Sequence, residues 1–149
     1  MVALIPCTDM VEYGNKLSAL ITAHVRADHT ITFIDCANSI SPYLFERDDL
    51  QSIKQQLFVA RIERLHDLVD AIERLPFDPL FQQSDMLLVS SWASLLADVP
   101  VRERTSVRHR VLSVLNRLEQ RQHLSIVVLD VNSPWATPYL QSGTLSMAN

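Results

Sequence analysis

Short apolar runs alternate with longer amphipathic stretches along most of the chain. Each run is rich in valine, isoleucine, leucine or phenylalanine and is bounded by polar residues, which is typical of strands buried on both faces of a sheet. The pattern predicts five strands: Val2–Pro6, Ile31–Asp35, Leu57–Arg61, Met86–Ser90 and Ser125–Asp130.

The stretches between these runs repeat apolar residues at helical spacing. In the first stretch, Leu17, Ile21 and Val25 share one face of a helix, with Thr8 or Asp9 as its N-cap. The predicted helices are Met10–Arg26, Arg47–Gln55, Leu65–Leu75 and Arg102–Gln122.

Buried strands separated by helices predict an α/β fold of three layers, with a five-stranded, mainly parallel sheet between the helices. Ligands of such sheets bind at the carboxyl ends of the strands, so candidate functional residues are those that follow each strand. We expect this domain to span residues 1–132. Residues 133–149 are rich in Pro, Ser and Thr and are predicted to form a loop or tail.

The composition, 48% hydrophobic and 20% charged over 149 residues, is that of one well-packed domain. A net charge of −4 gives no overall electrostatic reason to bind DNA, although it leaves room for a local basic surface. Cys7 and Cys36 lack ligand-like spacing. No signal peptide or membrane-length apolar run is visible, so we expect a cytoplasmic protein with reduced thiols and no membrane partner.

Five stretches follow one another through about Met1 to Asn132: "VALIPCTDMVEYGNKLSAL", "ITFIDCANSISP", "LFVARIERLHDLVDAIERL", "MLLVSSWASLL" and "LSIVVLDVN". In this order they resemble the ATPase core of the RecA/RadA recombinase family, above all the recombinase paralogues that assist a main recombinase. The resemblance implies a P-loop NTPase topology with strand order 5-1-4-3-2 and a process in DNA recombination or repair. It also implies edge-to-edge association, as a homodimer or with an intact RecA-like ATPase.

The first motif of the family, a phosphate loop, is degenerate here. Such a loop needs two glycines about five residues apart, because its backbone N–H groups curl around phosphate oxygens. The corresponding stretch "CTDMVEYGNKLS" holds only Gly14, and Asp9 and Glu12 would repel a triphosphate. Lys16 and Ser18 echo the motif, and a lysine and a serine in the first turns of a helix are the simpler interpretation.

Two further catalytic positions of the family lack the required chemistry. Ser90 and Ser91 stand where a carboxylate would organise Mg²⁺. Alignment of "FID", which ends at Asp35, puts Ala37 where the family has its water-activating glutamate. Without phosphate cradle, metal carboxylate and general base, the chain is predicted not to be an ATPase and to need no cofactor or metal. Lys16, Ser18, Asp35 and Ser90 are its vestigial cofactor-binding positions.

Other titratable residues favour structural roles. Asp35, Asp130 and Glu63 follow strands and either form a small polar site or cap helices and loops. Neither cysteine has a companion histidine or aspartate arrangement. The histidines lack metal-ligand spacing within one element: His24, His29, His66, His109 and His123.

Aromatic residues gather near the carboxyl ends of the predicted strands. Trp92 and Trp135 follow the fourth and fifth strands, where they suit a protein contact or simply cap a vacant pocket. Tyr43 lies near the same edge and is a third candidate for a protein contact.

The longest predicted helix is rich in arginine. Arg110, Arg117 and Arg121 share one side of it at spacings of seven and four. They form either a surface for a phosphate backbone or an acidic partner, or a solvated face.

These observations predict a non-catalytic RecA-like accessory or scaffold protein that binds protein partners. The alternative is a module that binds a small anion or nucleotide, as a sensor or weak enzyme, with Lys16, Ser18, Asp35 and Ser90 around the ligand.

Overall fold

A six-stranded sheet forms the centre of the protein in the computed structural model, which describes residues 2–97, 99–122, 124–131 and 145–147. The strands are β1 (Val2–Cys7), β2 (Ile31–Asp35), β3 (Leu57–Arg61), β4 (Met86–Val89), β5 (Ser125–Val131) and β6 (Leu145–Met147). They are arranged in the order β3-β2-β4-β5-β1-β6, and every neighbouring pair is parallel.

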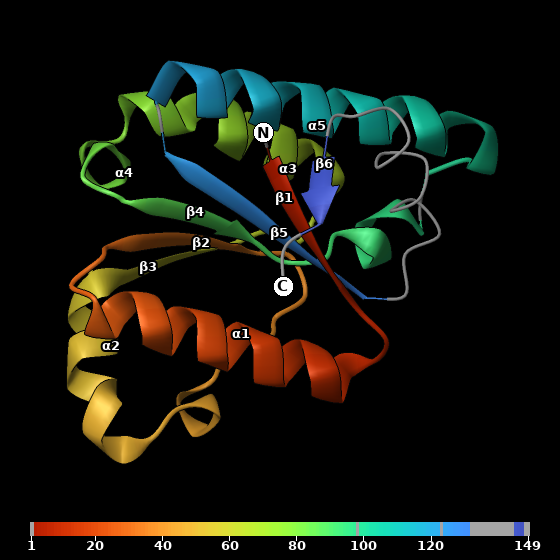
Figure 1. Cartoon of the computed structure of the whole chain (residues 1–149). Coiled ribbons are helices and arrows are strands. Elements are labelled where there is room, and N and C mark those ends of the chain that lie inside the picture. Colours follow the sequence, from red (N-terminus) through yellow and green to blue (C-terminus); the bar gives the residue numbers. More distant parts are fainter. Residues whose placement is uncertain (1, 98, 123, 132–144, 148–149) are drawn as a thin grey trace.

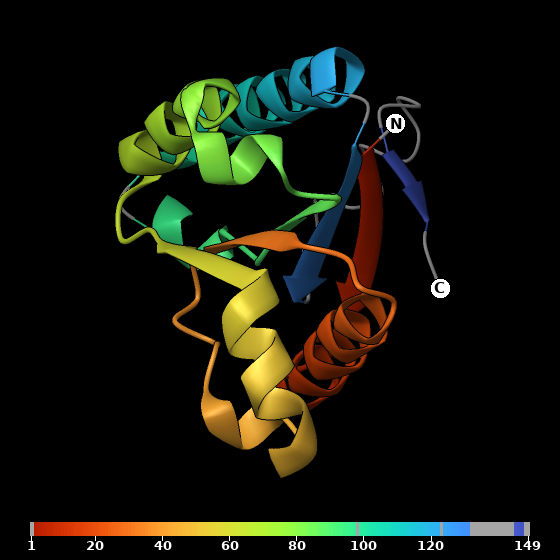
Figure 2. The same cartoon turned by 90° about the vertical axis from the view of Figure 1, so that its left-hand side faces the viewer.

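Helices cover both faces of this sheet, so the predicted three-layer α/β fold is confirmed (Figure 1). One face carries α1 (Met10–Arg26) and α2 (Leu50–Gln56). The opposite face carries α3 (Leu65–Arg74), α4 (Pro79–Gln82) and α5 (Val101–Gln122), as the turned view also shows (Figure 2). Short 3₁₀ helices lie between these elements: Pro42–Leu44, Arg47–Asp49, Leu75–Phe77 and Ala93–Leu96.

The predicted helix bounds agree with the structure to within a few residues, except for Arg47–Gln55. Its first turn is the 3₁₀ helix Arg47–Asp49, and the α-helix proper is α2. Within the described ranges, no helix is long and apolar enough to cross a membrane.

The strand order 5-1-4-3-2 is present, but the strands that make it up differ from those expected. From one edge to the other, the described strands lie in the order β6-β1-β5-β4-β2-β3. If β3 is set aside and the other five strands are numbered along the chain, this order reads 5-1-4-3-2. β3 is an extra strand at the edge, paired with β2 alone among the described strands. Its side chains are partly buried or exposed, whereas those of β2 are all buried, so Leu57–Arg61 suits an edge and not an inner position.

The sheet has six strands instead of five because residues within the expected loop or tail complete it. Leu145–Met147 pairs with β1 in parallel register, with Leu145 opposite Val2 and Met147 opposite Leu4. Three residues in a Pro-, Ser- and Thr-rich stretch carry too little periodicity to reveal a strand, and it is the backbone pairing with β1 that defines it.

An apolar cluster on each face of the sheet holds the layers together. Tyr13, Leu17 and Ile21 of α1 are at most 1% exposed and belong to the cluster on one face. On the other face, Leu68 of α3 and Leu115 of α5 are fully buried in a second cluster. Each such side chain contributes about 1.5–3 kcal/mol of burial free energy, so both helical layers are held firmly against the strands.

Candidate functional site

The turn between β1 and α1 is where the resemblance found in the sequence implies a phosphate loop. β1 ends at Cys7 and α1 begins at Met10, so only Thr8 and Asp9 lie between strand and helix. Asp9 is the N-cap, with Oδ1 accepting from the backbone N–H of Glu12 at 2.8 Å. The chain therefore enters the helix directly, and Gly14 and Lys16 lie within α1.

The donors at this helix N-terminus are taken by a carboxylate of the same chain. Glu12 accepts from both the backbone N–H and the hydroxyl of Thr8, and from Lys16 Nζ at 2.9 Å. The Lys16 ammonium and the Thr8 donors lower the pKa of Glu12 from 4.5 to about 2. Lys16 Nζ also donates to the carbonyl of Pro6 at 3.1 Å. A backbone N–H, a hydroxyl and an ammonium thus already surround one intramolecular anion.

At the carboxyl end of β2, a tight loop closes around Asp35. Its carboxylate accepts from the backbone N–H groups of Ala37, Ser39 and Ile40 at 2.9–3.2 Å, and from the Ser39 hydroxyl at 3.0 Å. Asn38 provides the left-handed residue of the loop, with φ 48°. Asp35 is 1% exposed, so of its two predicted roles, loop hydrogen bonding is the one that the structure shows.

Ser90 and Tyr13 extend this polar network across the ends of the strands. The hydroxyl of Ser90, which follows β4 and is fully buried, accepts from the backbone N–H of Cys36 at 2.6 Å. Tyr13 Oη lies 2.9 Å from Ser39 Oγ, and burial raises the pKa of Tyr13 to about 12. The network links α1, β2 and β4 through neutral hydroxyls around one carboxylate.

Tyr13 was missed by the sequence analysis, although a signal for it exists. It lies four residues before Leu17 and continues the buried stripe of α1. A tyrosine in such a stripe needs a partner for its hydroxyl, and that partner is the Ser39 of the loop.

Asp35, Asp130 and Glu63 do not form a single site. Asp35 and the exposed Glu63 line a common hollow of about 420 Å³ together with Arg61. Asp130 is buried elsewhere, with Oδ1 accepting from the hydroxyl of Ser91 at 3.1 Å.

The four residues predicted as vestigial cofactor-binding positions are also divided. Asp35 and Ser90 belong to the buried network, and Lys16 binds Glu12 and Pro6 at the start of α1. Ser18 donates to the carbonyl of Asn15 at 3.1 Å on the same helix.

The candidate contact residues have different surroundings. A protein contact through Trp92 requires an exposed side chain, and this interpretation is wrong: the side chain is 3% exposed and belongs to the same buried cluster as Leu96 and Leu112. The alternative, that Trp92 caps a vacant pocket, agrees better with this burial. Tyr43 is 98% exposed.

The arginines of α5 are described in part. Arg110 and Arg117 are exposed, as the solvated-face and binding-surface interpretations both require. The side chain of Arg121 lies outside the described residues, as does all of Trp135.

Histidines and cysteines take structural positions. His24 Nδ1 lies 3.0 Å from His29 Nδ1, and burial together with His29 lowers the pKa of His24. Cys7 and Cys36 are free and buried, and burial raises the pKa of Cys36 to about 12. Across the described part of the chain, no three His, Cys, Asp or Glu side chains are grouped so as to hold a metal ion.

Comparisons with known proteins agree with this architecture. No family model matches the sequence, and no curated protein matches it significantly. A crystal structure of the RadB recombinase superimposes with a TM-score of 0.62 over 87% of this chain, at 11% sequence identity. The match covers 61% of that recombinase chain, so the present chain corresponds to part of its length. By its strand order and this superposition, the protein has the fold of the RecA-like recombinases.

Proposed function

We propose that this protein is a non-catalytic RecA-like accessory protein, which binds protein partners in DNA recombination or repair. The partner is a second copy of the chain or an intact RecA-like ATPase. The fold supports the process only through its likeness to a recombinase, so the argument for the role depends on the candidate site.

The Glu12 carboxylate is the observation that carries this proposal. A phosphate binds to a helix N-terminus through backbone N–H groups and a lysine. Here the backbone N–H of Thr8 and the ammonium of Lys16 already donate to the Glu12 carboxylate. A nucleotide would have to displace an ionised carboxylate whose pKa is about 2, which disfavours binding at neutral pH.

The remaining strand ends support the same conclusion. Ser90 has no charge to organise Mg²⁺, and its hydroxyl accepts from the backbone of Cys36. The Asp35 carboxylate accepts hydrogen bonds from four donors of its own loop. Ala37, at the position of the family's water-activating glutamate, provides only its backbone N–H to Asp35. These residues stabilise the loops, which supports a non-catalytic role.

The edge of the sheet offers a surface for a partner. β3 pairs with β2 alone among the described strands, so its outer backbone groups face away from the sheet. Val59 of β3 is 41% exposed and lines a hollow of about 360 Å³ with Phe45 and Ile53. Unpaired strand edges beside apolar hollows suit association through an added strand, in keeping with edge-to-edge assembly.

Titration calorimetry with ATP and ADP, with and without Mg²⁺, tests the proposal. We expect no binding heat for the wild type at millimolar nucleotide, and none for Lys16→Ala. Lys54→Ala removes an exposed lysine outside the β1–α1 turn and is the matched control. Micromolar binding that Lys16→Ala abolishes and Lys54→Ala preserves would establish the nucleotide-binding alternative instead.

A further inference from the structure

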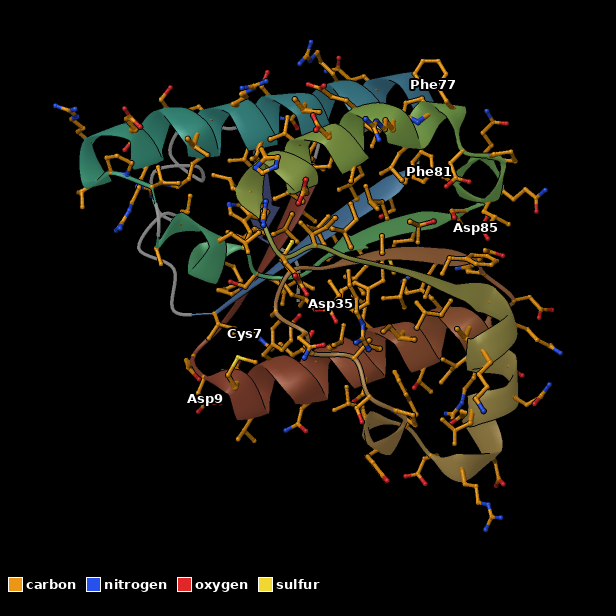
Figure 3. All side chains as sticks on the ribbon, turned by 180° about the vertical axis from the view of Figure 1, so that it is seen from behind. Cys7, Asp9, Asp35, Phe77, Phe81 and Asp85 are labelled. Atoms are coloured by element: carbon orange, nitrogen blue, oxygen red, sulfur yellow. The ribbon has the colours of Figure 1, made fainter. Side chains whose placement is uncertain are left out.

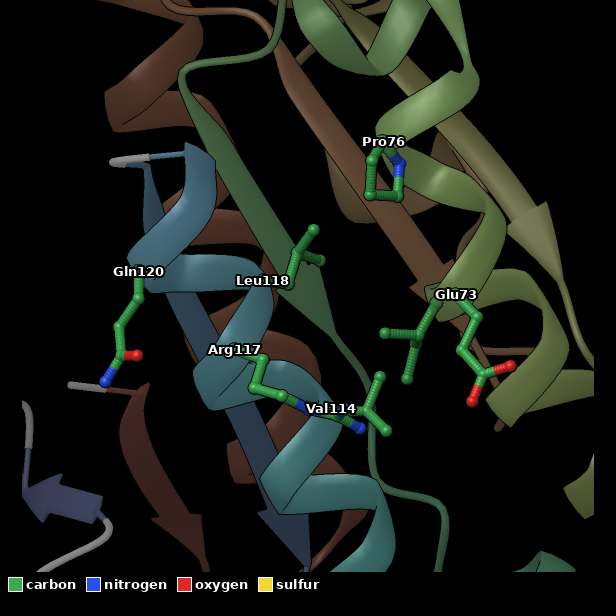
Figure 4. A pocket seen from close by; sticks show the side chains of 7 residues that line it. Glu73, Pro76, Val114, Arg117, Leu118 and Gln120 are labelled. Atoms are coloured by element: carbon green, nitrogen blue, oxygen red, sulfur yellow. The ribbon is translucent and has the colours of Figure 1, made fainter.

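A groove opens between α3 and α5, on the face of the sheet opposite α1. It has a volume of about 270 Å³, and Figure 4 shows Pro76, Val114 and Leu118 around it. Pockets for small-molecule ligands span about 300–1,000 Å³, so this groove is better matched to one protruding side chain than to a nucleotide.

The two walls of the groove carry opposite charges. Glu73 lies on α3 and Arg117 on α5, and both side chains are exposed. Within the described part of the chain, no ion pair joins either residue to a partner. Both charges are therefore available to groups that enter the groove from outside.

A large apolar side chain projects from the surface next to this groove. Phe77 follows Pro76 directly and is 79% exposed, and Leu80 on α4 is 49% exposed. Figure 3 shows Phe77 pointing away from the protein, while Phe81, one turn later, points into the core. An exposed phenylalanine next to a groove lined by both apolar and charged side chains is typical of a protein interface.

We propose that a second copy of this chain docks here, with Phe77 of each copy inserted into the α3–α5 groove of the other. An interface between two identical chains related by a two-fold axis must be self-complementary. This surface meets that condition, because it carries both a protruding side chain and a groove, and both a negative and a positive charge. Glu73 of each copy then faces Arg117 of the other.

The inference rests on the proposed function, because it selects the second copy of the chain as the partner and names the surface that binds this copy. The groove is remote from the candidate site in the fold. α3 runs from the carboxyl end of β3 toward the start of β4, so Glu73 and Pro76 lie near the amino ends of the strands. The dimer therefore leaves the candidate site at the carboxyl ends of the strands open for a different partner.

Charge reversal with sedimentation equilibrium tests the pairing. Glu73→Arg and Arg117→Glu should each raise the Kd of the dimer about tenfold or more, because each places like charges opposite one another. Phe77→Ser should weaken the dimer by a similar factor without loss of folding, since the side chain is exposed. Arg47→Glu, on the 3₁₀ helix Arg47–Asp49, and Val11→Ser, 74% exposed on α1, are the matched controls and should leave the Kd unchanged.

Mixing the two reversed variants distinguishes contacts between copies from contacts within one. A copy with Glu73→Arg and a copy with Arg117→Glu restore both opposite-charge pairs only across the interface, so the mixture should form a heterodimer that is tighter than the homodimer of either variant. A monomeric wild type, or a dimer that all three groove variants leave intact, would overturn the inference.

The outcome is independent of the nucleotide titration. A dimer that binds ATP through Lys16 would refute the non-catalytic function and leave the docking surface standing. A monomer that binds no nucleotide would refute the docking surface and leave the non-catalytic function standing.

Discussion

Asp35 ends a fully buried strand and accepts hydrogen bonds from four donors of the loop that follows it. Three of the donors are backbone N–H groups, for which the described residues offer no other acceptor. We predict that Asp35→Ala lowers the free energy of unfolding by about 2–4 kcal/mol, because it strands these donors. Urea denaturation followed by circular dichroism measures the loss.

Two further substitutions make this measurement specific to the hydrogen bonds. Asp35→Asn keeps one acceptor oxygen and should lose less stability than Asp35→Ala. Asp70→Ala replaces an exposed aspartate of α3 and should change stability by no more than about 0.5 kcal/mol. If Asp35→Ala were as stable as Asp70→Ala, the loop would not depend on its carboxylate.

The residue types at the strand ends could be predicted from the sequence, but not their use. Ala37 and Ser90 stand where the resemblance to the recombinases implies a base and a metal carboxylate, so the sequence predicts that this chemistry is missing. That Ser90 accepts from Cys36, or that Tyr13 reaches Ser39, depends on which strands lie side by side in the sheet. Such contacts span tens of residues of sequence and leave no local pattern.

At the scale of one element, the ionised Glu12 carboxylate stabilises the first turn of α1 electrostatically. The carboxylate has a pKa of about 2 in the folded protein and 4.5 ordinarily. Its contribution to the free energy of unfolding is therefore complete above pH 4.5 and is lost as the pH falls toward 2. We predict that a carbon-detected NMR titration places the Glu12 midpoint near 2.

The Lys16 ammonium is the largest cause of this shift. Lys16→Ala should therefore raise the Glu12 midpoint toward its ordinary value, while Lys54→Ala should leave it in place. An unchanged midpoint in Lys16→Ala would mean that Thr8 alone holds the carboxylate, and that Lys16 is free to meet a phosphate.

At the scale of the whole molecule, the layers could be predicted and the edges of the sheet could not. Buried strands and helix stripes carry strong periodic patterns, and both faces of the sheet formed as those patterns predict. β3 and β6 are edge strands. β3 is incompletely buried and β6 has three residues, so the hydrophobic pattern alone neither places β3 in the sheet nor reveals β6. Trp92 was misjudged for a related reason, since its burial depends on how the segment after β4 folds back.

β6 turns β1, the strand that leads into the candidate site, from an edge strand into an inner one. We predict that a chain ending at residue 144 loses about 2–3 kcal/mol of unfolding free energy, because three residue pairs with β1 are lost at about 1 kcal/mol each. For a domain of this size, calorimetry should show a fall in Tm of about 4–12 °C, with a greater tendency to associate through the bared edge. A chain lacking only residues 148–149 keeps the whole of β6 and is the matched control. Equal Tm values for the two truncated chains would mean that β6 adds nothing to the sheet, and that the fold is complete with five strands.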